Sequence, residues 1–137
     1  GDLGNYFANF SKETSDGGYV FTLQTNYLDW VTKLDSDGTI EWQKTNSLGE
    51  SIDAVRQTAD GGYAYLGYTT ALGAGGSDIY LVKTSSIGEI SWSKTFGTQE
   101  GEMGDSMEIC NDGGFILVGS TNDDIVVIKT DENGEVE

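Results

Sequence analysis

The side chains best suited to chemistry in this chain are carboxylates, because 23 Asp and Glu residues stand against 7 Lys and Arg residues, for a formal net charge of -16. There is no His, which removes the commonest general base and the commonest transition-metal ligand. The single Cys can form neither an internal disulfide nor a zinc site. This charge suits hard cations such as Ca²⁺ and disfavours nucleic acid and anionic membranes as partners.

Two short acidic segments have the composition of calcium-binding loops. They are "DSDG" at 35–38 and "DENG" at 131–134, and their oxygen donors are Asp35, Asp37, Asp131 and Asn133. Both lack the spacing and the closing Glu of an EF-hand. Asp-Gly and Asn-Gly are also the preferred two-residue hairpin turns, in which both positions have positive φ. We therefore expect hairpin turns here, with a peripheral Ca²⁺ site as the alternative and no other cofactor.

A third acidic segment contains Glu100, Glu102 and Asp105, and the sequence favours a solvated surface over a metal cage for it. Asp123 and Asp124 are a carboxylate pair of the kind that glycosidases use, but adjacent residues on a strand point to opposite faces. The single Cys has no His to activate it as a nucleophile. Nothing in the sequence assembles a nucleophile, a base and an oxyanion site, so we expect no enzymatic activity.

The elements that must position these residues are repeats. Asp-Gly-Gly followed by an aromatic residue occurs three times, within a single domain of units spanning about 5–47, 48–97 and 98–137. Each unit also has a lysine five residues before a glycine, and the third unit is incomplete. These lysines and two further repeat positions account for all 7 cations, so no cation is left over for a dedicated basic site.

Each unit is predicted to form four short strands. Apolar residues alternate with period 2, as at 90–93, and no 3.6-residue apolar stripe of useful length occurs. The triplet joins the first and second strands, because glycine accepts unusual backbone angles and Asp bonds its own turn. The sequence therefore favours a structural turn over a ligand-binding role for all of the triplet residues, which are Asp16, Gly17, Gly18, Asp60, Gly61, Gly62, Asp112, Gly113 and Gly114.

The units resemble the Asp-Gly-Gly-Tyr type of β-propeller repeat found in large secreted or surface proteins of bacteria and archaea. The segment "LVKTSSIGEISWSKTFG" is also similar to the second half of a quinoprotein-type blade. In that family a Gly-x-x-x-Trp ending places Trp between neighbouring blades, and Trp42 and Trp92 match it here. The resemblance implies an all-β fold of three four-stranded antiparallel blades, the last one truncated. It implies no quinone cofactor, because no residue of a quinone site can be matched.

Propellers close with about four to eight blades. The resemblance therefore implies either a partial propeller or half of a six-bladed ring that a homodimer completes. An open array of this kind exposes strand edges and sheet faces at both ends.

Candidate ligand-binding residues gather at one end of the predicted sheets. The loops between the second and third strands and between units vary, and variable loops on a rigid scaffold commonly bind ligands. The first strands should line the central axis, with three oxygen-bearing side chains near its mouth, and capping of strand ends is the favoured alternative for these three. The candidates are Asn9, Asp53 and Asp105 near the axis and Tyr27, Trp30, Glu100 and Glu102 in or beside the loops.

We expect a non-catalytic extracellular module, secreted or at the cell surface, that binds a protein or a glycan through these loops or serves as a scaffold. One alternative is a fragment of a propeller hydrolase or lyase whose catalytic residues lie in further blades. Another is a purely structural repeat of a surface protein. No run approaches the roughly 18 apolar residues of a membrane helix, so membrane insertion is not expected, and the N-terminus has no signal-peptide pattern.

Overall fold

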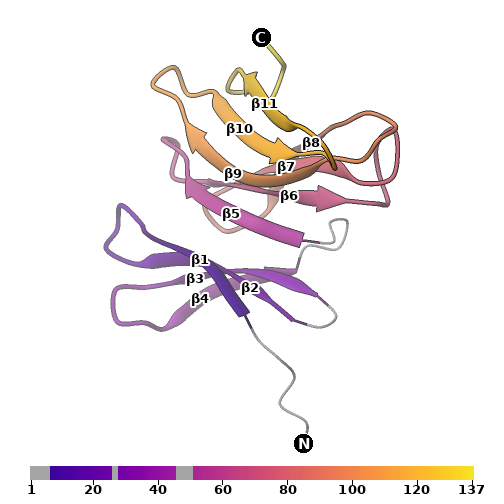
Figure 1. The fold of residues 1–137 in the computed structure, drawn as a ribbon. Helices are drawn as coiled ribbons and strands as arrows, with labels where there is room; N and C mark the ends of the chain where they lie inside the picture. Colours follow the sequence, from indigo (N-terminus) through magenta and orange to yellow (C-terminus); the bar gives the residue numbers. More distant parts are fainter. Residues whose placement is uncertain (1–6, 26–27, 46–50) are drawn as a thin grey trace, which may run out of the picture.

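The computed structural model describes residues 7–25, 28–45 and 51–137, and every element within these ranges is a β-strand (Figure 1). Sheet 1 contains β1 (Phe7–Glu13), β2 (Tyr19–Gln24), β3 (Asp29–Leu34) and β4 (Ile40–Thr45). Sheet 2 contains β5 (Ser51–Gln57), β6 (Tyr63–Thr69), β7 (Asp78–Thr84) and β8 (Ile90–Phe96). Sheet 3 contains β9 (Met103–Ile109), β10 (Phe115–Ser120) and β11 (Ile125–Thr130).

Strands that follow one another in the chain are also neighbours in each sheet, and all pairs are antiparallel. Sheet 3 has three strands, and a single bridge between Thr130 and Val136 extends it beyond β11. The prediction of an all-β chain made of repeated antiparallel sheets is therefore confirmed, with 4, 4 and 3 strands. The described residues contain no helix that is long and apolar enough to span a membrane.

A single kind of turn occurs at six places, of which five join two strands and the sixth leads from β11 to the bridge between Thr130 and Val136. In the first, Thr14 N donates to Gly18 O at 2.8 Å and Gly17 N donates to Thr14 O at 2.9 Å. The glycine in each turn has a φ between 78 and 86°, and no described residue other than glycine has positive φ. The expected two-residue turns at Asp37-Gly38 and Asn133-Gly134 are therefore wrong. Three residues form each loop, and only the last, a glycine, adopts the left-handed conformation that the twist of the strands requires.

The three sheets stack face to face, and the two interfaces are alike. We call the side of each sheet that contacts the next sheet its forward face, and the side that contacts the previous sheet its rear face. Val20 and Val31 on the forward face of sheet 1 pack against Tyr63, Tyr80 and Val82 on the rear face of sheet 2. The forward face of sheet 2 packs in the same way against the rear face of sheet 3, through Leu66, Ile79, Leu81, Phe115 and Leu117.

A tryptophan from the last strand of one sheet seals each interface. Trp42 lies edge-to-face with Tyr63 at a centroid distance of 5.3 Å, and its Nε1 donates to the backbone oxygen of Ser86 at 3.1 Å. Trp92 lies edge-to-face with Phe115 at 6.1 Å. Each indole also covers a turn glycine of the next sheet, where an added Cβ would lie within 3.0 Å of the ring. Large apolar rings over a bare backbone contribute strongly to packing.

Candidate functional site

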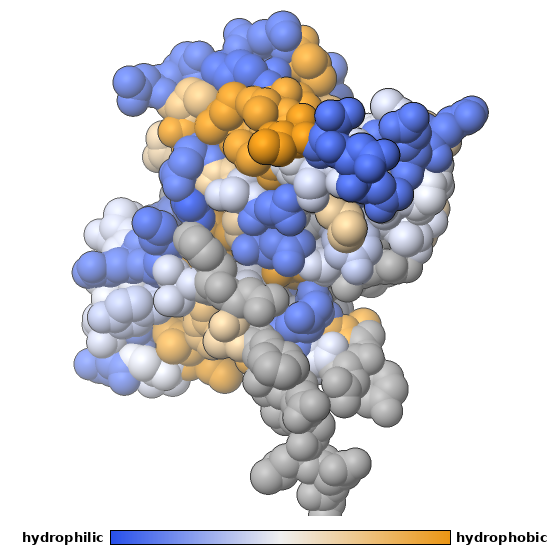
Figure 2. All heavy atoms as spheres, in the orientation of Figure 1, coloured by the Kyte–Doolittle hydropathy of each residue, from blue (hydrophilic) through white to orange (hydrophobic). Residues whose placement is uncertain are grey.

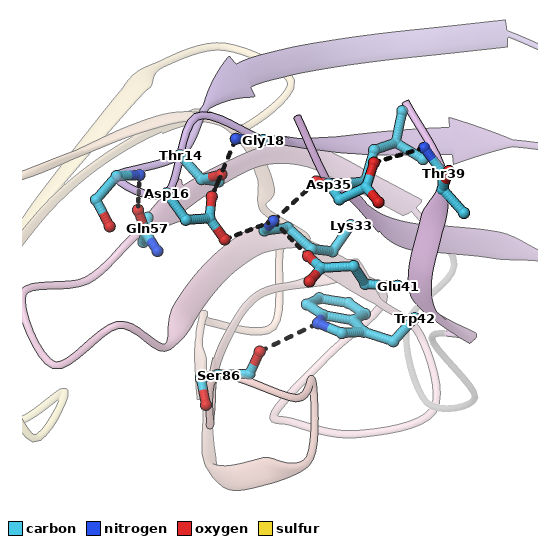
Figure 3. Close-up of polar contacts among 12 residues, drawn as sticks. Thr14, Asp16, Gly18, Lys33, Asp35, Thr39, Glu41, Trp42, Gln57 and Ser86 are labelled. Atoms are coloured by element: carbon cyan, nitrogen blue, oxygen red, sulfur yellow. Dashed lines mark hydrogen bonds and ion pairs between the residues drawn. The ribbon is translucent and has the colours of Figure 1, made fainter. Parts of the chain in front are cut away.

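A lysine ties each Asp-Gly-Gly turn to the third strand of its sheet, and it is buried in sheets 1 and 2 and partly exposed in sheet 3. Lys33 Nζ lies 2.9 Å from Asp16 Oδ2, 2.5 Å from Glu41 Oε2 and 2.8 Å from the backbone oxygen of Leu34 (Figure 3). Burial opposes the charge of Lys33, but the hydrogen bonds to Glu41 and Asp16 outweigh it and raise its pKa. Lys129 has the same three kinds of partner, Asp112, Glu137 and the backbone oxygen of Thr130.

The Asp of each triplet serves its own turn as well as the lysine. Asp16 Oδ1 accepts hydrogen bonds from the Thr14 hydroxyl at 2.5 Å and from Gly18 N at 3.0 Å. The Thr14 hydroxyl and then Lys33 hold the pKa of Asp16 well below its usual range. Asp60 and Asp112 occupy the same position, and their pKa values are lowered chiefly by Lys83 and by Lys129. These aspartates are therefore bound into turn networks.

Lys83 is the exception among the three lysines. Its Nζ lies 2.8 Å from Asp60 Oδ2 and 2.9 Å from the backbone oxygen of Thr84. Among the described residues, it contacts no second carboxylate, because Ser91 stands where sheet 1 has Glu41. Both residues occupy the β-bulge of the last strand directly beside the lysine. Ser91 has no carboxylate, and Lys83 Nζ bonds only to Asp60 and to the Thr84 backbone oxygen among the described residues.

A cavity of about 590 Å³ opens beside Lys83, between sheets 2 and 3 at the end that carries the short turns. Trp92 and Phe115 form its apolar wall, and Ser91, Asn111 and Lys83 supply polar groups. Asn133, named above as a donor for a peripheral Ca²⁺ site, lines this cavity. The sequence did not single out Lys83, because every lysine falls at a repeat position. The signal that marks the site is the single replacement of Glu by Ser between aligned units.

The axial candidates occupy equivalent positions at the opposite end of the first strands. Asn9, Asp53 and Asp105 are each the unpaired residue of a β-bulge in β1, β5 and β9. The side chain of Asn9 lies outside the described residues. Asp53 accepts a hydrogen bond from the Ser51 hydroxyl at 2.6 Å, and Asp105 accepts one from the Ser120 hydroxyl at 3.2 Å.

Electrostatics couples the axial carboxylates to one another. Burial, and then the charge of Asp105, raises the pKa of Asp53. Asp29, which the sequence analysis did not single out, accepts a hydrogen bond from Ile52 N at 2.8 Å, and burial followed by the charge of Asp53 raises its pKa. Asp29 is buried, Asp53 is half-buried and Asp105 is exposed. The charge of Asp105 acts on Asp53, and the charge of Asp53 acts on Asp29. The sequence places an Asp at the end of the corresponding loop in each unit, but at the strand position of Asp29 the other sheets have Ile79 and Ile125.

The other loop candidates differ in what the structure shows of them. Tyr27 lies outside the described residues, Trp30 is partly buried in β3, and Glu100 is exposed. The expectation of a solvated acidic loop is wrong for Glu102, which is only 4% exposed. Its two oxygens accept hydrogen bonds from Thr98 N at 2.8 Å and from the Thr98 hydroxyl at 2.6 Å, so the carboxylate organises its own loop.

Two of the calcium candidates, Asp35 and Asp131, accept backbone hydrogen bonds within their own turns. Asp35 Oδ1 accepts hydrogen bonds from Asp37 N at 2.9 Å and Thr39 N at 2.8 Å, and Asp131 Oδ1 does the same for Asn133 N and Glu135 N. The backbone hydrogen bond from Glu135 is the main cause that lowers the pKa of Asp131. Within the described ranges, no three His, Cys, Asp or Glu residues are grouped so that they could hold a metal ion.

Comparison with known proteins gives this chain no relative from which to transfer a function. No protein-family model matches it, and no curated protein matches it significantly.

Proposed function

We propose that this chain is a non-catalytic binding or scaffolding module of the β-propeller type, and that a second copy closes its ring. Three sheets from each of two copies would give six blades, which is within the range of known propellers. The proposal covers an extracellular setting and recognition of a protein or a glycan, as the sequence leads us to expect. Its support comes from the two ends of the stack.

The observation that carries the proposal is that the two unpaired end faces are of opposite kinds. Each internal interface joins a forward face to a rear face. Among the described residues, neither core cluster includes the rear face of sheet 1 or the forward face of sheet 3. A second copy can therefore continue the stack at both ends through the same kind of contact, and a closed pair leaves no sheet face unpaired.

Both open faces expose apolar residues. On sheet 3, Ile125 is 79% exposed and Val127 is 61% exposed, and Figure 2 shows apolar side chains gathered over this sheet. On sheet 1, Tyr19 is 44% exposed, whereas its counterpart Tyr63 is buried under Trp42. Contiguous exposed apolar surface of this kind commonly marks an interface, because burying it removes about 25 cal/mol per Å².

Binding is proposed for the end of the stack that carries the variable loops. The 70–77 and 97–102 loops of sheet 2 rise from this end, as do the bulges that hold Asp53 and Asp105. Rigid sheets beneath loops of different length are a common arrangement for recognition. The acidic groups at the axis favour sugar hydroxyls or basic protein side chains over anions.

Light scattering after size exclusion tests the ring. We expect twice the 14.7 kDa mass of one chain, and we expect Ile125→Glu combined with Val127→Glu to give monomers. Ile87→Glu is the matched control, because Ile87 is 62% exposed in a turn of sheet 2 and lies on neither end face. A monomeric parent chain would refute the ring, and so would a series of larger open assemblies.

A further inference from the structure

The cavity beside Lys83 has an unfilled position that the other two sheets fill with a carboxylate. Lys33 and Lys129 each bind two carboxylates and one backbone oxygen, whereas Lys83 binds one carboxylate and one backbone oxygen. In sheet 1 the second carboxylate belongs to Glu41, and Ser91 takes its place in sheet 2. The fold therefore accommodates a second carboxylate at this lysine in two of three repeats.

A second difference between the two interfaces lies beside the same cavity. Between sheets 1 and 2, Gln57 Oε1 accepts a hydrogen bond from Ser15 N at 2.8 Å and bridges the two sheets (Figure 3). At the corresponding position between sheets 2 and 3 stands Ile109, which has no acceptor to offer the amide of Ala59. Both Ile109 and Ala59 line the cavity. Sheet 2 therefore lacks the Glu that pairs with the lysine in sheet 1, and the second interface lacks the Gln that bridges the first.

The walls suit a ring that has one apolar face and several hydroxyls. Trp92 and Phe115 provide the aromatic surface, and Trp92 is held in place by its contact with Gly134. Ser91 and Asn111 add a hydroxyl and an amide at the rim. Aromatic rings with hydrogen-bonding groups around them form a surface on which the C–H face of a sugar can rest.

We propose that this cavity binds a hexuronate, with the sugar carboxylate on Lys83 in the position that Glu41 occupies beside Lys33. The ring lies against Trp92, and its hydroxyls face Ser91 and Asn111. Asp60 and Asp112 also line the cavity, but each is already paired with a lysine, and Glu132 is exposed at the rim. The site lies at the end opposite the variable loops, so it is independent of the proposed ring and of loop-mediated binding.

Calorimetric titration of the full chain with sodium glucuronate tests the assignment. We expect binding to the parent chain at one site, and Ser91→Glu should weaken it about tenfold or more, because the new carboxylate takes the place of the ligand on Lys83. The substitution should leave the melting temperature unchanged or raise it. Ser93→Glu is the matched control, because it adds the same charge to an exposed position of β8 that pairs with Val82 on the rear face.

Three further probes identify the chemistry that the cavity recognises. Glucose lacks the carboxylate and should bind at least about tenfold more weakly than glucuronate. Absence of glucuronate binding, equal binding of glucose, or undiminished binding by Ser91→Glu would each overturn the proposal. Tighter binding of acetate would show that the ring contributes nothing, and tighter binding of N-acetylglutamate amide would assign the cavity to acidic peptides instead.

Discussion

At the scale of single residues, the fold distinguishes two classes of aspartate. Those in the Asp-Gly-Gly turns accept hydrogen bonds from a hydroxyl or backbone amide and pair with a lysine, and their pKa values fall. Their contribution to stability is present above their unfolded pKa and is lost as the pH falls through the folded one. Asp29 is buried and Asp53 is half-buried, and burial followed by a nearby like charge raises the pKa of each. An acid of this second class destabilises the fold when it is ionised.

Asp53→Asn should therefore stabilise the protein at neutral pH. The amide still accepts the Ser51 hydroxyl but removes a charge that burial and Asp105 disfavour. The ionised form is disfavoured only above the ordinary pKa of 3.8, so the gain should shrink to nothing as the pH falls below that value. Melting temperatures measured at a series of pH values check this, with an expected rise of a few degrees at neutral pH.

Asp37→Asn is the control for the change in net charge alone, because Asp37 lies exposed in a turn. A melting temperature for Asp53→Asn that is lower than that of the parent chain at neutral pH would contradict the argument. So would a gain that persists unchanged in acid.

At the scale of strands and turns, repetition made most of the architecture predictable. The recurrence of Asp-Gly-Gly and the alternation of apolar residues indicated antiparallel sheets, and the aligned lysines indicated one recurring position. What those lysines bind could not be predicted, because the partner Glu41 reaches Lys33 only through a bulge in β4. The turn type was also missed, since Asp-Gly is compatible with both two-residue and three-residue loops. The sequence shows that unit two has Ser91 at the repeat position of Glu41. Only the structure shows that a cavity between sheets 2 and 3 lies beside this position.

Alanine variants at two turn glycines, Gly38 and Gly88, distinguish the cost of backbone strain from the cost of a steric clash at a sheet interface. Gly88 and Gly38 have φ values of 79 and 83°, so alanine at either position is strained by about 1 to 2 kcal/mol. A Cβ on Gly88 would lie 2.9 Å from the ring of Trp42, whereas no described atom lies within 4 Å of that position at Gly38. Gly88→Ala should therefore destabilise the chain by about 1 to 3 kcal/mol more than Gly38→Ala. Urea unfolding of the two variants measures the difference.

Equal losses for the two alanine variants would mean that Trp42 does not seal the first interface. The comparison also bears on the proposed ring. If a second copy covers the turn at Gly38, the alanine variant at that position should show a loss that depends on protein concentration, because association contributes to stability by mass action.

At the scale of the whole molecule, the net charge of -16 opposes the association that the apolar end faces favour. Two copies brought together repel one another over distances that salt shortens, since the screening length is about 10 Å at 0.1 M ionic strength and about 3 Å at 1 M. The contacts between sheets are largely apolar, with ion pairs such as Arg56 to Glu108 and Lys44 to Glu89 at the margins. Screening by salt should therefore weaken the repulsion between the two net negative charges more than it weakens the attraction from ion pairs.

We accordingly expect the proposed dimer to bind more tightly as the concentration of sodium chloride is raised. Sedimentation velocity at a series of protein concentrations gives the dissociation constant of the dimer at each salt concentration. This constant should decrease as salt is raised from about 0.05 M to about 0.5 M. Calcium chloride at matched ionic strength is the control. A stronger effect of calcium would assign a specific cation to the acidic surface, and equal effects would leave general screening as the cause. A dimer that dissociates as salt rises would instead mean that ion pairs hold the copies together, and the apolar end faces would then not be the interface.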